Sequence, residues 1–355
     1  MDPSKRGGKS PYSWYRESVV GNEDVHWEKV KKLNFGIDYA LFEGLFAGSV
    51  EVFRDKRSDI LIGGSSRSVP SYYGQKPATV NKGKVNTRGY ELELRFNKKF
   101  KNEMRVWANL SMTHSENEVI VKDDKPLLPS YRKDAGFSMG QGRYYIDKGF
   151  IGSYDELYGS PKHEANNDSR IPGDYYIVDF DGNGIIDQDD QAPYGYSGTP
   201  QNTYNATVGF EWKGFSCFAQ FYGVTNVNRT VSLDCFTNRY NVVFDTGSWW
   251  SETGDAADFV TPRWLSSKVA AYNGTQYVYD ASFIRLKNVE VSYTFKNTLT
   301  RQLGISGLRV FISGNNLWMW SRMPDDREGN FSGAGANYGA YPIMKRVNLG
   351  VKFSL

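Results

Sequence analysis

The sequence predicts an all-β protein whose long antiparallel strands form part of a transmembrane β-barrel. Three observations predict this fold class. Apolar and polar side chains alternate along about nine segments, and these segments approach the roughly 9–11 residues with which a tilted strand crosses a bilayer. The connections between the segments then alternate between short and long, as they do in outer-membrane barrels.

The final segment shows the alternation most clearly, because its apolar residues Val347, Leu349, Val351, Phe353 and Leu355 are separated by charged, polar or small ones. Such a pattern gives a strand one apolar and one polar face. The same pattern predicts strands at approximately residues 29–41, 45–56, 85–97, 103–116, 202–212, 215–227, 283–295, 307–320 and 343–355.

The connections fall into two classes. Short ones are expected at residues 42–44, 98–102, 213–214 and 296–304, and long ones at residues 57–84, 117–201, 228–282 and 321–342. Short periplasmic turns and long extracellular loops produce this alternation. A soluble sandwich has no reason to maintain it over so many strands.

Composition agrees with this fold class. Aromatic residues make up 15% of the 355 residues and there are 36 glycines, a combination typical of barrels with aromatic girdles. No apolar run approaches the roughly 18 residues of a transmembrane helix. The mean hydropathy of −0.56 does not conflict with a membrane location, because barrel interiors and loops are polar. The net charge of only +3 argues against a nucleic-acid partner.

The N-terminus carries no apolar segment of the kind found in signal peptides. We therefore expect the sequence to begin partway through a longer precursor. An odd number of strands agrees with this expectation, because bacterial barrels of one chain have an even number. The first and last strands should then pair with strands that are absent from this sequence, since unpaired edges are costly in hydrocarbon.

One long connection contains a calcium-loop pattern, Asp179-Phe180-Asp181-Gly182-Asn183-Gly184-Ile185-Ile186-Asp187-Gln188-Asp189-Asp190. The expected Ca²⁺ ligands are Asp179, Asp181, Asn183, the Ile185 carbonyl, Asp187 (directly or through water) and Asp190. Asp190 replaces the usual glutamate and reaches bidentate geometry less easily. The flanking residues are extended in pattern, so an isolated calcium loop with a structural ion is predicted. The alternative is a turn cluster without an ion.

Catalytic patterns are weak, and no enzyme activity is predicted. The three histidines lack metal-ligand spacing, and neither a nucleophile elbow nor a phosphate-binding loop is present. The long loop after the sixth strand contains Trp249, Trp250 and Trp264. These are candidate substrate-binding residues, because exposed aromatic rings stack on sugars or hold peptides. Alternatively, they form a small loop core or dock a partner protein.

Several segments together resemble the SusC/RagA-type TonB-linked outer-membrane proteins of Bacteroidetes. The segments are Tyr277 to Val289, Gly314-Asn315-Asn316-Leu317, Tyr341-Pro342 with the closing strand, Trp27-Glu28-Lys29, Lys84 to Leu94 and the calcium-like loop. The resemblance extends from about residue 20 to the end. It implies that residues 28–355 are the C-terminal part of a large plugged barrel, that residues 1–27 form a leading extracellular segment, and that the plug is absent.

The resemblance also implies a function and partners. Such transporters lie in the outer membrane, contact its lipid, and import glycans or peptides with energy from TonB through the missing N-terminal part. A SusD-like surface lipoprotein covers the barrel. Two alternatives come from other classes: a secreted all-β calcium-binding module or enzyme acting on glycans, and a passive porin. Nothing in the sequence identifies the cargo.

Overall fold

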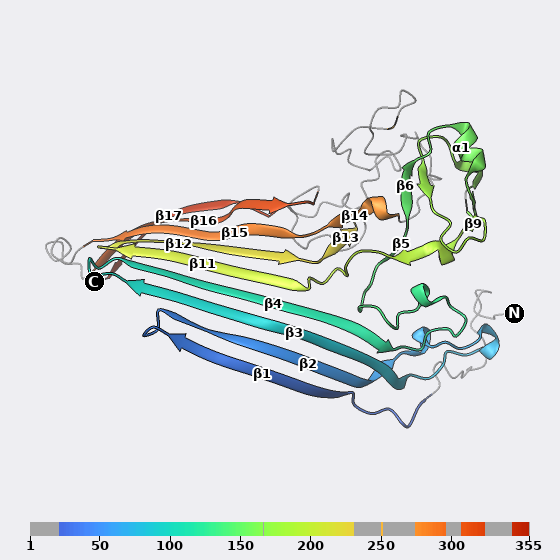
Figure 1. Ribbon diagram of the computed structural model, residues 1–355, viewed down its shortest axis with the longest axis horizontal. Helices are drawn as coiled ribbons and strands as arrows, with labels where there is room; N and C mark the ends of the chain where they lie inside the picture. Colours follow the sequence, from blue (N-terminus) through green and yellow to red (C-terminus); the bar gives the residue numbers. More distant parts are fainter. Residues whose placement is uncertain are drawn as a thin grey trace, which may run out of the picture.

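A computed structural model describes residues 21–165, 167–230, 250, 274–295, 307–323 and 343–354. Nine strands form a single antiparallel sheet in the order β1-β2-β3-β4-β11-β12-β15-β16-β17. Each strand pairs with its nearest neighbours along the chain within this sheet, and β1 and β17 lie at opposite edges (Figure 1). This arrangement confirms the predicted fold class of a barrel-wall segment.

The strands of the sheet are β1 (Lys29–Leu41), β2 (Phe46–Ile62), β3 (Val80–Lys99), β4 (Arg105–Val121), β11 (Asn202–Trp212), β12 (Phe215–Thr225), β15 (Phe283–Thr294), β16 (Gly307–Ser321) and β17 (Arg346–Ser354). At its loop end lie β5 (Arg143–Tyr145), β6 (Asp147–Phe150), β7 (Lys162–His163), β8 (Tyr175–Ile177), β9 (Ile185–Ile186), β10 (Gln191–Pro193), β13 (Asn228–Thr230), β14 (Val278–Asp280) and the helix α1 (Tyr154–Gly159). Among the described residues, no helix has the length and apolar character needed to cross a membrane.

The nine predicted strands are present, but three are longer than predicted. β2, β3 and β4 extend toward the loop end by several residues each. Their extra residues mix apolar, polar and charged side chains without strict alternation, so the pattern that predicted the strands stops before the backbone pairing does. The last strand starts at Arg346, three residues after the predicted start. The predicted turn at residues 296–304 lies outside the described residues.

The short turns use backbone conformations with positive φ. Lys213 and Gly214 have φ of 47° and 90°, the combination that a two-residue type I′ hairpin requires. Between β1 and β2, Phe42, Glu43 and Gly44 have φ of 54°, 57° and 83°. These tight turns hold the strand ends together on the side opposite the elaborated loops (Figure 1).

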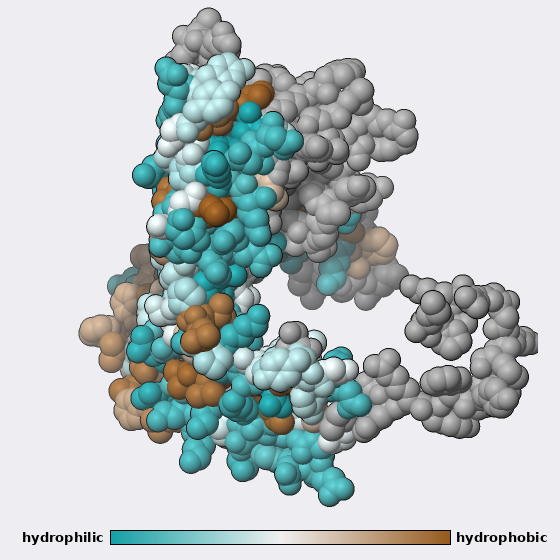
Figure 2. All heavy atoms as spheres, turned by 90° about the vertical axis from the view of Figure 1, so that its right-hand side faces the viewer, coloured by the Kyte–Doolittle hydropathy of each residue, from teal (hydrophilic) through white to brown (hydrophobic). Residues whose placement is uncertain are grey.

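Apolar side chains occupy one face of the sheet. Leu92 lies opposite Val50 and Met112, and further along the sheet Ile312 lies opposite Val291 and Leu349. Many of these side chains are exposed, including Phe35 at 67% and Leu349 at 78%. Figure 2 shows hydrophobic side chains gathered on the convex side of the sheet. A water-soluble sheet would bury this face against a second layer, so we assign it to lipid and call it the outward face.

The opposite, inward face is polar. Glu93 lies opposite Ser49 and Ser111. Gln220, Asn288 and Asn315 form an amide ladder across three strands, in which Asn288 donates to Gln220 and Asn315 donates to Asn288, both at 2.6 Å. This combination of an apolar outward face and a polar inward face is that of an outer-membrane barrel wall.

Glycine and aromatic residues are paired across neighbouring strands of the inward face. Gly89 lies opposite Phe53, Gly209 opposite Trp107, and Gly350 opposite Phe311. A Cβ atom added to any of the three would lie 2.5 Å or less from a ring atom of its partner. The rings therefore lie over the glycine backbone, which explains part of the sequence's glycine and aromatic content.

Compact apolar cores lie at the loop end. Tyr145, Ile177 and Ile186 form one cluster with Tyr175 packed against it. Val224, Val227 and Ala281 form another at the tops of β12 and β15. The loops are thus folded onto a rigid rim and can hold side chains in fixed positions.

The assignment of the faces predicts a difference between outward and inward positions of β11. Val208→Lys places a charge in lipid near the middle of the strand and should destabilise the assembled barrel by about 2–4 kcal/mol. Asn205→Lys, on the polar inward face of the same strand, is the matched control and should have little effect. The measurement is denaturant unfolding of the parent protein in lipid vesicles. Equal destabilisation by both variants would contradict the assignment of the faces.

Candidate functional site

The long connection between β4 and β11 folds into a small layer of its own. Its strands pair as β5 with β10, β6 with β8, and β7 with β9. Arg143 ties this layer to the preceding segment through an ion pair with Asp134 at 3.0 Å, and its guanidinium lies over the Phe137 ring. The calcium-loop pattern lies between β8 and β10, which agrees with the predicted extended flanks.

The first half of the calcium loop winds around the carboxylate of Asp179. This carboxylate accepts hydrogen bonds from the backbone N–H groups of Gly182 and Gly184, each at 2.7 Å. Gly182 and Gly184 have φ of 76° and 87°, which glycine adopts without steric cost. Although burial acts to raise the pKa of Asp179, these N–H donors lower it below its ordinary value. A carboxylate that remains ionised at neutral pH suits a Ca²⁺ ligand.

Asp190 closes the loop from the other end. It is fully buried and accepts hydrogen bonds from the backbone N–H groups of Phe180 at 2.6 Å and Asp187 at 2.8 Å. Burial raises its pKa above the ordinary value. Oxygens of Asp179, Asp181 and Asp190 lie within 4.8 Å of one another, so the fold brings together three of the predicted ligands.

The other three predicted ligands have different surroundings. Asp187 accepts a hydrogen bond from the N–H of Asp189 at 2.7 Å and caps the turn that follows. Asn183 donates its side-chain amide to Asp181 at 3.0 Å and accepts from the N–H of Ile185 at 2.7 Å. This arrangement provides a three-carboxylate centre, and the full ligand set remains a prediction.

The calcium loop is anchored to a neighbouring segment. The Tyr131 hydroxyl donates to the carbonyl of Asp189 at 2.7 Å, and the rings of Tyr131 and Phe180 make an edge contact at 4.8 Å between centroids. Arg132 lies 3.4 Å from the Asp189 carboxylate. An ordered calcium loop therefore helps to position residues 130–132.

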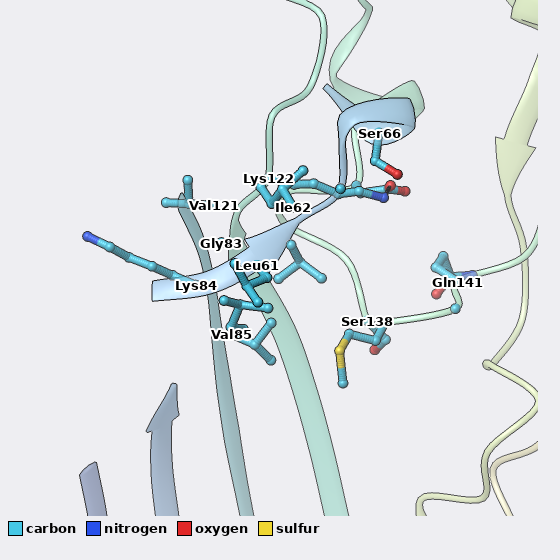
Figure 3. A pocket seen from close by; sticks show the side chains of 16 residues that line it. Leu61, Ile62, Ser66, Gly83, Lys84, Val85, Val121, Lys122, Ser138 and Gln141 are labelled. Carbon is cyan, nitrogen blue, oxygen red and sulfur yellow. Dashed lines mark hydrogen bonds and ion pairs between the residues drawn. The ribbon is translucent and has the colours of Figure 1, made fainter. Parts of the chain in front are cut away.

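A pocket opens at the tops of β2, β3 and β4 (Figure 3). Its volume is about 410 Å³. Val85 and Val119, both buried, lie directly opposite each other, and Val85 shares the inward face of β3 with Glu91 and Glu93. Met139, from the folded loop, lines the other side, and polar residues including Lys122 and Gln141 lie at the rim. The pocket thus combines an aliphatic floor with a polar rim at the mouth of the barrel wall.

Asp123 holds two loops together beside this pocket. Its carboxylate binds Lys82 Nζ at 2.5 Å and Arg67 Nε at 2.7 Å, and it accepts from the backbone N–H of Ser68 at 3.1 Å. Only 9% of the Asp123 side chain is exposed. The bond from Lys82, with those from Arg67 and Ser68, lowers the pKa of Asp123 to about 2. Sequence patterns did not indicate this ion cluster or the pocket, because partners 41 to 56 residues apart leave no local signal.

The predicted aromatic site falls mostly outside the described residues. Trp249 and Trp264 lie outside them, and Trp250 is described only as partly buried. The assignment of these three residues to cargo binding remains a prediction.

An open antiparallel sheet with a lipid-facing apolar side and an elaborated loop end defines a class of protein, the outer-membrane β-barrels. Comparisons narrow this class. No family model matches the sequence. The chain is 25% identical over 353 residues to TonB-dependent receptor P3 of Formosa agariphila, covering 93% of the chain and 34% of that relative. It is 24% identical over 327 residues to TonB-dependent receptor SusC of Bacteroides thetaiotaomicron, covering 89% of the chain and 31% of SusC.

A solved structure described as the RagAB peptide transporter has the same fold, with a TM-score of 0.68 at 20% identity, over 94% of this chain and 36% of that chain. The chain thus spans about a third of the length of its relatives. The predicted resemblance to SusC/RagA-type TonB-dependent receptors is confirmed, as is the outer-membrane location. The relatives are receptors and transporters, which agrees with the prediction that the chain is not an enzyme.

The Asp123 cluster predicts a pH-dependent contact between loops. The Asp123 carboxylate has a lowered pKa in the folded state. Its contribution to the stability of the loop contact is therefore complete above the ordinary pKa of 3.8 and is lost as pH falls toward about 2. Asp123→Asn should abolish this pH dependence and speed hydrogen exchange in residues 63–79 at neutral pH. Asp124→Asn is the control and should leave that exchange unchanged, because it keeps the carboxylate that binds Arg67 and Lys82. Unchanged exchange in the Asp123 variant would contradict the role of the cluster.

Proposed function

We propose that the chain is the part of a TonB-dependent outer-membrane importer that walls the channel and carries extracellular loops toward the cargo. The observation that carries this proposal is the sheet itself, whose apolar outward face and polar inward face accompany loops that, among the described residues, are elaborated at one end only. A secreted calcium-binding module would not expose such a continuous apolar face to water. The similarity to TonB-dependent receptors supports the proposal from an independent direction.

The cargo belongs to the glycans or peptides, and a SusD-like surface lipoprotein covers the loop end. The folded layer formed by β5 to β10 and the mouth pocket support this arrangement, because both present ordered side chains at the end where cargo and a lid would arrive. None of the described residues that line the pocket is aromatic. Its aliphatic floor fits an apolar peptide side chain better than the face of a sugar ring, so uptake assays should compare both cargo classes.

Calcium has a structural role in this proposal. The clustered oxygens of Asp179, Asp181 and Asp190 repel one another when ionised, and a divalent cation would offset that repulsion. The ion would stabilise the loop and, through Tyr131 and Arg132, the segment beside it. The sheet does not depend on the ion, because inter-strand hydrogen bonds hold it.

Calcium binding can be tested in the parent receptor by isothermal titration. We expect a dissociation constant on the order of 0.1–1 mM, as in extracellular modules. Asp190→Asn should weaken binding by about tenfold or more, because it removes a charged ligand from the centre. Asp189→Asn is the matched control, since its side chain points to Arg132. Chelation should speed hydrogen exchange in residues 122–201 and leave the sheet protected; equal affinities in both variants would contradict the ligand assignment.

The transport proposal can be tested by uptake in cells that produce the parent receptor. Labelled oligopeptides and oligosaccharides should enter only when TonB is present. Truncating Trp249 and Trp250 together to alanine should reduce uptake or lid co-purification several-fold, if these rings contact cargo or lid. Phe42→Ala removes an exposed aromatic ring at the short-turn end and is the matched control. Uptake that is independent of TonB would overturn the proposed function, whereas wild-type behaviour of the tryptophan variant would exclude only those residues.

A further inference from the structure

The outward face of β1 to β3 changes from apolar to basic near its loop end. Phe35, Val52 and Tyr90 form one of the last apolar rows across the first three strands. Five cations on the same face follow toward the loops: Lys31, Arg54, Lys56, Lys84 and Arg88. All five are exposed, and we call them the basic band.

Alternation along each strand places the basic band on the lipid side. Lys31 shares a face of β1 with Phe35 and Ile37, because successive side chains point to opposite faces. By the same parity, Arg54 and Lys56 share a face of β2 with Val50 and Val52. Lys84 and Arg88 share a face of β3 with Tyr90 and Leu92. The band therefore borders the apolar surface and does not face the channel.

Like charges lie directly opposite one another within the band. Lys31 is the cross-strand partner of Lys56, and Arg54 is the partner of Arg88. Such pairs are destabilising on their own. Arg88 makes an ion pair with Glu116, but among the described residues the other four cations form no ion pair. The arrangement has an excess of positive charge that an anion would offset.

A polar cleft lies beside these pairs. Its volume is about 250 Å³, and Arg54, Arg88, Glu116 and Glu118 help to line it. The basic band is confined to this side of the sheet. At the loop-side ends of β15 and β16, the outward face carries the exposed side chains of Ile284, Trp318 and Trp320 instead.

We propose that the basic band binds phosphate groups on lipid headgroups of the outer leaflet. Cations at the border of an apolar surface lie at headgroup height, where each Lys or Arg attracts anionic lipid. A lipid occupies this position better than an acidic protein would, because the adjoining rows of Phe35 and Val52 already face acyl chains. The proposal requires only the membrane orientation of the sheet, so it can fail while the transport proposal stands.

The experiment uses the full parent receptor, purified in mild detergent and placed in phosphatidylcholine nanodiscs with or without phosphorylated lipid A. The variant combines Lys31→Gln, Arg54→Gln and Lys56→Gln. The matched control removes three charges at the short-turn end, with Lys98→Gln, Lys99→Gln and Lys101→Gln. A third variant, Lys31→Arg, Arg54→Lys and Lys56→Arg, retains the charge. Lipid A bound per receptor is measured by mass spectrometry, with added inorganic phosphate and raised salt as competitors.

We expect the first variant to lose lipid A binding by about tenfold or more, while the control and the charge-retaining variant bind as the unaltered receptor does. Raised salt should weaken binding in the unaltered receptor, because it screens exposed charges. Equal binding by the first variant and the control would overturn the proposal. The proposal would also be wrong if the first variant lost a co-purifying acidic protein and not lipid. Full displacement of lipid A by inorganic phosphate would overturn it as well, because it would indicate a site for the free ion. If the first variant does not assemble, salt-insensitive binding by the unaltered receptor remains sufficient to overturn it.

Discussion

The structure depends on one constraint: backbone N–H and C=O groups in hydrocarbon must bond to one another, because no water is available. An antiparallel sheet meets this requirement through its inter-strand ladder. The side chains of each strand are then free to differ between two faces, and here one face is apolar and the other polar. Loops that leave the hydrocarbon escape the constraint, which is why the small apolar cores, the Asp123 cluster and the longer irregular segments of the described chain lie at one end.

This constraint also explains which parts of the fold could be predicted from the sequence. Strands β1 and β11 begin and end where the alternation does, since each lies largely within the two-faced part of the sheet. The ends of β2, β3 and β4 could not be predicted, because the added residues, which include Ile60, Leu61 and Val119, do not alternate strictly between apolar and polar side chains. Pairing nevertheless continues there, as Asn86 and Glu118 lie opposite each other in the ladder. Periodicity reports a difference in environment between the two faces of a strand, and it fails where the faces do not differ in this way.

The candidate site was predictable only where its chemistry is local in sequence. The calcium-loop pattern holds its turn residues and carboxylates within one short segment, so spacing alone placed Asp179, Asp181 and Asp190 together. Spacing did not show that Asp187 caps a turn, because competition between ligation and backbone capping depends on three-dimensional detail. The Asp123 cluster was not predictable at all. Arg67 reaches Asp123 from the connection between β2 and β3, and Lys82 reaches it from β3. No periodicity connects these residues.

The motifs that resemble the SusC/RagA proteins have a structural explanation in this chain. Register shifts between β15 and its neighbours leave Lys287 on one strand, and Asn316 and Leu317 on the next, outside the regular pairing. Asn316 adopts a positive φ of 53°, which asparagine tolerates better than most residues, and Leu317 lies over Gly314. Beyond this bulge, Arg285 is buried beside Phe283 and Met319. Bulges bend strands and redirect their side chains, so these motifs shape the rim on which the loops stand.

A motif that shapes the rim identifies the kind of barrel and carries no information on cargo. In the proposed importer, the side chains that distinguish one cargo from another are expected in the loops and on the inward face near the mouth, where the sequence is free of the lipid constraint.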